Sequence, residues 1–428
     1  MEADVAILGA GFAGLGAGYA AQKLGKRVII FEKDTTYGGL CGNFRVDGFH
    51  FDQAIHMSFT EDELCQSVFF SQPYYRHSPE ALNYKKGVWI RNPVQNNLRA
   101  LPVDERIKII KGFVERKKAE GMRVENYREW LDLKFGQYFT DNYPELYTRK
   151  YWATNSYELS ASWCGARIYQ PSLDEVLAGA FPDAEEPENV YYAKIMRYPK
   201  KGGYKTFVKA CADALDIRYG HEAVNVDTEN KVISMRNGAT CSYQTLISTI
   251  PLPVLARLVS ADENITEAAQ KLKSTSMALV SVGFKKEIKF PTIWFYVYDE
   301  EIPFARAYSP SMKSPDNAPE GKSSLQFEIY YSEEFPLKDS DEHLTQRTLD
   351  AMEQMGLAKK EDVEAIDIRH VRYANIMFYL GMEEYRGRVR RYMHDLGIVT
   401  CGRFGEWDYL WSHQSFLSGY DAVINFVG

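Results

Sequence analysis

The stretch Asp4-Val-Ala-Ile-Leu-Gly-Ala-Gly-Phe-Ala-Gly14 carries the pattern that decides the fold. A short apolar run predicts a buried strand, the glycines predict a tight turn, and the small residues from Phe12 to Leu24 predict a helix. A second apolar run, Arg27 to Phe31, predicts the next strand and is followed by Glu32. This order of strand, turn, helix and strand is typical of a Rossmann-type dinucleotide-binding fold.

Each residue of the motif has a physical role in that fold. Gly9 permits the turn, Gly11 lets the backbone approach a pyrophosphate, and Gly14 lets helix and strand pack closely. The helix N-terminus attracts phosphate charge, and Glu32, eighteen residues after Gly14, can accept hydrogen bonds from a ribose. Three glycines alone are weak evidence, since turns are rich in glycine. The strand, the helix and the acidic residue around them favour dinucleotide binding.

Further glycines favour FAD over NAD. Gly38-Gly39-Leu40 follows Glu32 after a short loop and predicts a second backbone approach to the pyrophosphate. Near the far end, Gly402-Arg403-Phe-Gly405 precedes a helical pattern that contains Ser415 and Phe416. A chain whose last segments return to the nucleotide site resembles the FAD-binding superfamily that includes amine oxidases. The alternative is that Gly402 and Gly405 are ordinary turn residues.

The remaining chain predicts an α/β protein with insertions. Helical periodicity from Pro102 to Leu146 indicates a helical insertion, and alternating apolar runs at Ala278–Phe284, Ile293–Tyr298 and Leu325–Tyr331 indicate an antiparallel sheet. We therefore expect a GR2-like, Rossmann-type FAD-binding domain with a helical insertion and an antiparallel β-sheet substrate domain. The expected division is residues 1–85, 195–275 and 385–428 for FAD, 86–194 for a mostly helical lid and 276–384 for the sheet.

Composition excludes several functional classes. The formal net charge of −7 argues against a general nucleic-acid binder. No apolar run is long enough to cross a bilayer, and the first residues do not form a signal peptide, so we expect a cytoplasmic protein without a membrane partner. The six cysteines form no CxxC pair, so we expect neither structural zinc nor a disulfide framework.

Four ordered segments resemble the UDP-galactopyranose mutase family, and more closely its eukaryotic-type branch. The segments are Trp89-Ile-Arg-Asn-Pro-Val-Gln-Asn-Asn-Leu98, Ser162-Trp-Cys-Gly-Ala-Arg167, Pro303-Phe-Ala-Arg-Ala-Tyr-Ser-Pro310 and Gly402-Arg-Phe-Gly-Glu-Trp-Asp-Tyr409. Each segment is short, and their joint order over most of the chain carries the resemblance.

The resemblance implies a set of substrate-binding residues. Arg167 and Arg306 would grip the diphosphate, which suits a guanidinium because it is always charged and offers a planar fork of donors. A surface charge or a structural ion pair is the alternative for each arginine, and core packing is the alternative for any of the 29 tyrosines. The remaining implied contacts are Tyr296, Tyr373 and Tyr409 on the diphosphate, Gln95 and Asn96 near the nucleotide base, and Arg403 on the flavin.

Two departures from the family pattern affect the expected site. His56 matches a mobile histidine beside the flavin, but the paired glycines before it are replaced by Ala54 and Ile55, which puts the loop motion in doubt. His413 stands where eukaryotic-type enzymes carry asparagine. Together they suggest a relative that uses a different nucleotide sugar. A hydrogen-bonded structural histidine is the alternative for His56.

The resemblance implies an FAD-dependent isomerase. Reduced flavin N5 would act as nucleophile on the anomeric carbon of a nucleotide-diphosphate sugar, UDP-linked by resemblance, and interconvert pyranose and furanose forms without net redox. NADPH or NADH would reduce the flavin beforehand, and a homo-oligomer is left open. The alternative is an FAD-dependent oxidoreductase of the amine oxidase, desaturase or protoporphyrinogen oxidase type, whose FAD motifs would be the same.

Overall fold

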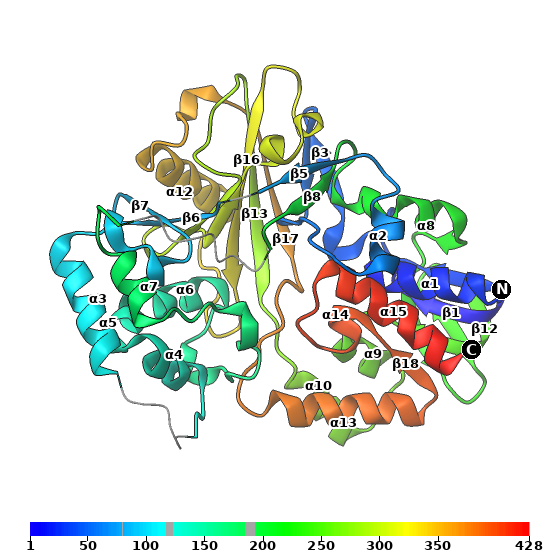
Figure 1. Cartoon of the computed structure of the whole chain (residues 1–428). Helices are drawn as coiled ribbons and strands as arrows, with labels where there is room; N and C mark the ends of the chain where they lie inside the picture. The colour runs from blue at the N-terminus through cyan, green and yellow to red at the C-terminus, as the bar shows by residue number, and fades with distance from the viewer. Residues whose placement is uncertain (79, 117–122, 185–192, 428) are drawn as a thin grey trace.

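The computed structural model describes residues 1–78, 80–116, 123–184 and 193–427. Parts of the expected helical unit, at 117–122 and 185–192, lie outside the described residues. In Figure 1 the nucleotide-binding sheet lies at the right, the helical segment at the lower left, and a second large sheet between and above them.

The first sheet is the expected Rossmann-type core. Its central strand β1 (Glu2–Leu8) pairs in parallel with β2 (Val28–Phe31) on one side and with β12 (Thr240–Ser248) on the other. The strand order is β10-β11-β12-β1-β2-β9, with β18 also on β12. The remaining bounds are β9 (Ile217–Arg218), β10 (Ala223–Asp227), β11 (Val232–Met235) and β18 (Ile398–Thr400). The order confirms the fold class expected from the N-terminal motif.

Two helices from opposite ends of the chain pack closely against each other beside this sheet. Helix α1 (Phe12–Lys23) follows β1, and helix α15 (Ser412–Phe426) lies near the C-terminus. A Cβ atom added to Gly419 would lie 1.9 Å from the Ala13 carbonyl oxygen, and one added to Gly16 would lie 2.0 Å from that of Phe416. Glycine is therefore needed on both helices for their backbones to approach so closely.

The segment from Gly202 to Leu215 becomes helical only after its two leading glycines, and its helical part is divided. Gly202 and Gly203 have φ values of +80° and +75°, which an α-helix cannot contain. A 3₁₀ turn, η6 (Tyr204–Val208), comes next and leads into α8 (Lys209–Ala214).

The second sheet has seven strands in the order β17-β13-β16-β15-β14-β6-β7. All pairs are antiparallel except β14 with β6, which is parallel. Its strands are β6 (Leu82–Lys85), β7 (Val88–Arg91), β13 (Ser276–Phe284), β14 (Trp294–Val297), β15 (Arg306–Tyr308), β16 (Ser323–Tyr331) and β17 (Val363–Val371).

The hairpin of β6 and β7 corrects two expectations. The sheet is mixed rather than wholly antiparallel, and the expected boundary between residues 85 and 86 falls inside this hairpin, whose two strands bond to each other and, through β6, to β14. The sequence does not predict this pairing, because β14 pairs with a strand some 200 residues earlier in the chain. The three-part division stays a proposal, with residues 82–91 moved to the sheet domain.

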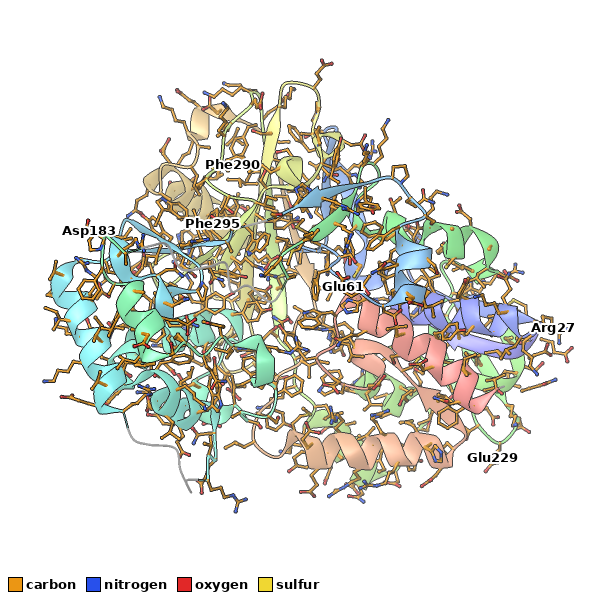
Figure 2. All side chains as sticks on the ribbon, in the orientation of Figure 1. Arg27, Glu61, Asp183, Glu229, Phe290 and Phe295 are labelled. Atoms are coloured by element: carbon orange, nitrogen blue, oxygen red, sulfur yellow. The ribbon has the colours of Figure 1, made fainter. Side chains whose placement is uncertain are left out.

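One face of the second sheet packs on helix α12 (Asp341–Gln354), where Leu344, Leu349 and Met352 meet Val280, Val282 and Phe327. Figure 2 shows Phe290 and Phe295 inside this region, whereas Arg27 and Glu229 stand at the periphery. The opposite face of the sheet is directed toward the nucleotide-binding unit. Because side chains alternate along a strand, every second residue of these strands is available to build a site there.

The helical insertion contains the expected helices. They are α3 (Val103–Glu115), α4 (Tyr127–Phe135), α5 (Gln137–Asn142), α6 (Pro144–Tyr151) and α7 (Leu173–Ala178), with 3₁₀ turns η2 (Val94–Asn96), η3 (Leu98–Ala100), η4 (Ser156–Glu158) and η5 (Gly165–Arg167). Phe135, Phe139 and Tyr143 form its aromatic interior. Helix α6 ends at Tyr151, which reaches the cavity described below.

The other elements connect these units. They are η1 (Gly39–Cys41), β3 (Asn43–Val46), β4 (Phe49–Asp52), α2 (Glu63–Phe69), β5 (Tyr74–His77), β8 (Met196–Pro199), α9 (Leu252–Leu258), α10 (Glu263–Gln270), α11 (Pro310–Lys313), η7 (Pro315–Asn317), η8 (Lys360–Asp362), α13 (Met382–Asp395) and α14 (Gly402–Gly405). All six cysteines are free and buried. Among the described helices, none combines the length and apolar character that crossing a bilayer requires.

The contact between α1 and α15 gives a test of the fold. We expect Gly419→Ala to lower the free energy of unfolding by ~1–3 kcal/mol, because the added methyl group collides with the backbone of α1. Gly387→Ala in α13 is the matched control. Its Cβ would lie 3.4 Å from the end of the flexible Arg391 side chain, so helix propensity should make it neutral or stabilising by up to ~1 kcal/mol. Urea unfolding of both variants measures the difference; equal stabilities would contradict the close approach.

Candidate functional site

A cavity of ≈ 1130 Å³ lies where the nucleotide-binding unit meets the second sheet. It is lined by the turn after β1, the loop around Gly39, the segment 53–59, the inner face of the second sheet and the segment 403–415. Drug-sized ligands occupy pockets of roughly 300–1,000 Å³. The cavity can therefore hold a dinucleotide together with part of a second ligand.

The glycine turn forms one end of the cavity. Gly9 has a φ of +97°, which glycine adopts without strain, and Gly11 is the N-cap of α1 without a side-chain cap. The first N–H groups of a helix lack partners within the helix, so this N-terminus offers donors to a phosphate. Gly14 does not line the cavity, because it packs beneath the turn, where a Cβ would lie 1.9 Å from the Gly9 carbonyl oxygen.

The second glycine loop approaches the first through bare backbone. Gly38 donates its N–H to the Ala10 carbonyl at 2.9 Å, and a Cβ on Gly39 would lie 3.3 Å from the Gly11 Cα. Leu40 lines the cavity beside them. Glu32 is buried and accepts the Ala10 N–H at 2.7 Å, which holds its carboxylate at the cavity wall. This helix N-terminus, with uncapped backbone beside a fixed carboxylate, fits the pyrophosphate and ribose of FAD.

The C-terminal segment supplies the other side. Arg403 lines the cavity and donates to the Leu410 carbonyl and to Asn375 Oδ1, each at 3.1 Å. Its Nε is buried and has no hydrogen-bond partner among the described residues, which leaves a donor for a ligand. Ser415 also lines the cavity, whereas Phe416 is buried between helices. Gly402 lies behind the wall with a φ of +78°, where a Cβ would meet that of Ala13.

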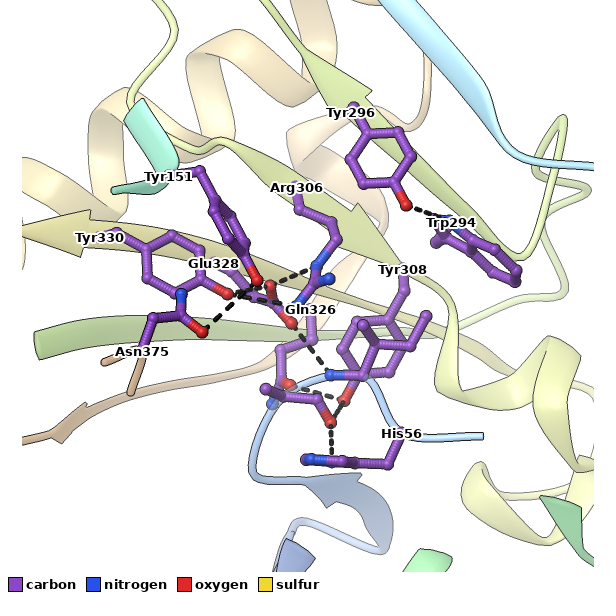
Figure 3. Close-up of polar contacts among 12 residues, drawn as sticks. His56, Tyr151, Trp294, Tyr296, Arg306, Tyr308, Gln326, Glu328, Tyr330 and Asn375 are labelled. Atoms are coloured by element: carbon purple, nitrogen blue, oxygen red, sulfur yellow. Dashed lines mark hydrogen bonds and ion pairs between the residues drawn. The ribbon is translucent and has the colours of Figure 1, made fainter. Parts of the chain in front are cut away.

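The inner face of the second sheet is the polar floor of the cavity. Strand pairing sets Tyr296 opposite Arg306, and Arg306 opposite Glu328. Tyr330 follows Glu328 by two residues, and Trp294 precedes Tyr296 by two, so all five side chains share one face (Figure 3). The Trp294 indole donates to the Tyr296 hydroxyl at 3.1 Å.

Arg306 is held by two charge-assisted contacts. Its Nε donates to Glu328 Oε2 at 2.5 Å, and its Nη2 donates to the Tyr330 hydroxyl at 3.2 Å. Burial opposes the guanidinium charge, but the Glu328 carboxylate together with the nearby tyrosines Tyr330 and Tyr151 raises the pKa of Arg306 well above the usual value. The arginine is therefore charged and oriented, with further N–H groups at the cavity wall.

Tyrosines that the sequence did not single out complete this region. The Tyr151 hydroxyl lies 3.4 Å from the Tyr409 hydroxyl and 3.4 Å from Asn375 Oδ1. Burial raises the pKa values of Tyr151 and Tyr330 well above 10, so both hydroxyls stay protonated and can donate. The alternation of Gln326, Glu328 and Tyr330 with apolar residues along one strand predicts that these polar side chains share one face. No comparable pattern marks Tyr151.

His56 lies at the cavity wall with a defined tautomer. Its Nδ1 is 3.1 Å from the Ala54 carbonyl oxygen, which can only accept, so Nδ1 carries the proton and Nε2 is an acceptor in the neutral ring. Burial lowers the pKa of His56 to about 4. Ala54 has a φ of +80°, the left-handed region that glycine prefers. Ala54 therefore adopts the backbone conformation that a glycine would adopt without strain, whereas Ile55 does not have a positive φ.

Arg167 and His413 lie behind the aromatic wall of the cavity rather than in its lining. Arg167 donates to the Tyr409 carbonyl at 2.6 Å and stacks over the rings of Tyr409 and Trp411, each 4.2 Å from the guanidinium. Tyr409 and Trp411 do line the cavity. His413 stacks on Trp411 and contacts the edge of Phe59, and burial lowers its pKa.

The structure gathers some expected residues and not others. Tyr373 lines the cavity next to Phe404. Gln95 and Asn96 do not line it: Gln95 donates to the Tyr169 carbonyl at 2.9 Å, and Asn96 is fully buried with its Nδ2 unpartnered among the described residues. The expected residues that line the cavity are Gly9, Gly11, Glu32, Gly38, Gly39, Leu40, His56, Tyr296, Arg306, Tyr373, Arg403, Tyr409 and Ser415.

The model of the flavin containing amine oxidoreductase family matches residues 12–422. The chain belongs to this family. The match begins at Phe12, inside the glycine motif, and extends through the C-terminal segment, and membership in this family supports FAD as the cofactor.

Solved structures share the fold over the whole chain. The crystal structure of a reduced UDP-galactopyranose mutase superposes with a TM-score of 0.94 at 24% identity, covering 100% of this chain and 94% of the other. A putative protoporphyrinogen oxidase from Exiguobacterium gives 0.75 at 16% identity, covering 98% of each chain. A putrescine oxidase variant gives 0.65 at 16% identity, covering 100% and 99%. These likenesses confirm the expected fold, and the family match confirms the expected superfamily.

Curated relatives match over a short segment only. Human all-trans-retinol 13,14-reductase is 45% identical over 53 residues, which are 12% of this chain and 9% of the relative. The rat protein of the same name is 40% identical over 53 residues.

The neutral, half-buried His56 predicts a pH dependence of stability. Its pKa is about 4 in the folded protein against ~6.5 in an unfolded chain, so the unfolded state binds the extra proton first as pH falls. The stability that His56 contributes is fully present above pH ~6.5 and should be lost, by up to about 3 kcal/mol, as pH falls toward 4. His56→Gln should flatten this part of the profile in urea unfolding, whereas His394→Gln, at a side chain 71% exposed, serves as the control. If the stabilities of the wild type and of His56→Gln change in parallel with pH, the low pKa of His56 is contradicted.

Proposed function

We propose that this flavoprotein is an FAD-dependent nucleotide-sugar mutase that interconverts pyranose and furanose forms of a UDP-linked sugar without net redox. The observation that carries the proposal is the oriented, charged Arg306 on a tyrosine-rich floor that faces the dinucleotide-binding loops across one cavity. A fixed guanidinium among protonated hydroxyls suits an anionic, polar ligand such as a sugar diphosphate.

The residues of the cavity have separate proposed roles. Arg306 holds the diphosphate, with Arg167 contributing from behind Tyr409, and the hydroxyls of Tyr296, Tyr373 and Tyr409 donate to its oxygens. Holding the leaving diphosphate close favours its return to the sugar. When bound, reduced FAD would supply a nucleophilic nitrogen for attack on the anomeric carbon of the sugar. Arg403, fixed by Asn375 and Leu410, places a positive charge against the flavin, which favours its anionic reduced form.

Two further expectations are part of the proposal. His56 presents the Nε2 acceptor toward the flavin side of the cavity, because its Nδ1 proton is engaged by Ala54. Gln95 and Asn96 lie outside the cavity lining, so they contribute to the nucleotide site only if the helical segment shifts when substrate binds. His413, on α15, also lies outside the lining and would act on the sugar site through Trp411, on which it stacks. NADPH or NADH is the proposed reductant.

The likeness to a UDP-galactopyranose mutase supports this proposal over the oxidoreductase alternative. Its TM-score is 0.94, against 0.75 or less for the oxidase structures above. The short resemblance to retinol reductases covers too little of the chain to favour an apolar substrate.

The direct test is a ring-isomer assay. Dithionite-reduced protein is mixed with UDP-, dTDP- and GDP-linked pyranoses and furanoses, and exchange is followed by chromatography. We expect exchange with a UDP-sugar only when the flavin is reduced, with no stoichiometric use of reductant. Turnover of an amine or another organic reductant by the oxidised protein, without ring exchange, would instead establish the oxidoreductase alternative.

Arg306 gives a residue-level prediction. Arg306→Lys keeps the charge but loses the fork of donors, and Arg306→Ala loses both. We expect both variants to retain FAD, and UDP-sugar binding to weaken by at least about tenfold in calorimetry, more for alanine than for lysine. Arg388→Ala, an exposed arginine on α13 paired with Glu384, is the control. Unchanged affinity in both Arg306 variants would reject the proposed diphosphate contact.

A further inference from the structure

Glu328 joins two parts of the cavity that the proposed function treats separately. Its side chain is fully buried on β16, and each carboxylate oxygen accepts from a different unit. Oε1 accepts the Ile55 backbone N–H at 2.9 Å. Oε2 accepts from Arg306 Nε at 2.5 Å and from the Tyr330 hydroxyl at 2.7 Å. One carboxylate therefore holds both the arginine and the turn that carries His56 (Figure 3).

The turn needs such a contact. Ala54 has a φ of +80°, and non-glycine residues keep this conformation only where the surroundings fix it. Around Ala54 the fixing contacts are Glu328 on the next N–H, and His56 Nδ1 and the Tyr308 hydroxyl near the Ala54 carbonyl, at 3.1 and 3.2 Å. The Tyr308 hydroxyl has one proton and lies closer to Gln326 Oε1, at 2.6 Å. Glu328 is thus the charged anchor of the turn.

Arg306 needs the same carboxylate. A buried guanidinium is stabilised by its paired anion, and a buried carboxylate left without its cation is strongly unfavourable. A diphosphate that approaches Arg306 competes with Glu328 for the same positive charge and repels the carboxylate. Any displacement of Glu328 acts at once on the Ile55 N–H, because the two oxygens belong to one rigid group.

We infer that Glu328 is a positioning residue that couples occupancy of the Arg306 anion site to the geometry of the Ala54–His56 turn. The inference rests on the proposed function for the identity of the anion, but the link between Arg306 and the turn rests on contacts within the chain. It gives a route by which a bound nucleotide sugar adjusts the histidine beside the flavin. Gly-Gly flexibility is not required, since the turn is held through its backbone N–H.

The test measures hydrogen exchange and UDP affinity on the FAD-loaded protein. Peptides covering residues 53–57 report the Ile55 amide, with UDP as the probe ligand. We expect UDP to change this exchange rate in the wild type. In Glu328→Ala the amide should exchange about tenfold faster or more, without a response to UDP.

Two further variants separate positioning from general damage. Glu328→Gln can satisfy the Ile55 N–H or the Arg306 Nε but not both, since its amide has one acceptor oxygen, so the UDP response of the turn should be lost even if the protein is as stable as the wild type. Tyr330→Phe removes the hydroxyl from Arg306 and Glu328 but leaves the Ile55 contact, so UDP affinity should fall while basal Ile55 exchange stays unchanged.

The outcomes distinguish this inference from the proposed function. If wild-type Ile55 exchange is the same with and without bound UDP, or if Glu328→Gln keeps the wild-type response, the coupling is wrong. If UDP does not bind the wild type at all, the nucleotide-sugar proposal fails. The effect of Glu328→Ala on Ile55 exchange then still decides whether the carboxylate holds the turn.

Discussion

The buried pairing of Glu328 with Arg306 is the constraint on which the cavity depends. A guanidinium, a tyrosine hydroxyl and a backbone N–H converge on this fully buried carboxylate and satisfy both of its oxygens. This convergence fixes the register of β15 against β16 and sets the polar face of the sheet toward the flavin side. The same strands turn their apolar residues to α12, so one sheet supplies both a packed core and a polar floor.

The opposite wall of the cavity consists of glycine backbone without side chains. Gly11 and Gly39 bring two loops together, and Gly16 and Gly419 bring α1 against α15. At each place a methyl group would collide with backbone or fill the space a phosphate needs. The cavity thus combines bare backbone at the dinucleotide end with charged and hydroxyl groups at the other end.

The sequence predicts the nucleotide-binding half well because its information is local. The turn at Gly9–Gly14 needs particular residues at fixed spacing, and Glu32 directly follows the adjacent strand, so short-range patterns were enough. The Arg306 environment was predictable in part, because alternation along β16 marks Glu328 as facing a polar space. Contacts between segments far apart in the chain produce no local sequence pattern. The parallel β6–β14 pairing, Tyr151 at the end of α6, and the displacement of Gln95 and Arg167 from the lining all depend on how distant segments fold together.

The junction of α1 with α15 has a consequence for the order of folding. The flavin cavity is closed by residues from the first turn of the chain and by Arg403 and Ser415, separated by some 400 positions. During synthesis the N-terminal strand and helix emerge early, yet their glycine faces stay unpaired until the last helix arrives. A topology dominated by such distant contacts folds slowly, and the nascent half-site exposes apolar surface meanwhile. The cavity is therefore complete only when the segment that carries Arg403 and Ser415 has packed against the β1–α1 unit.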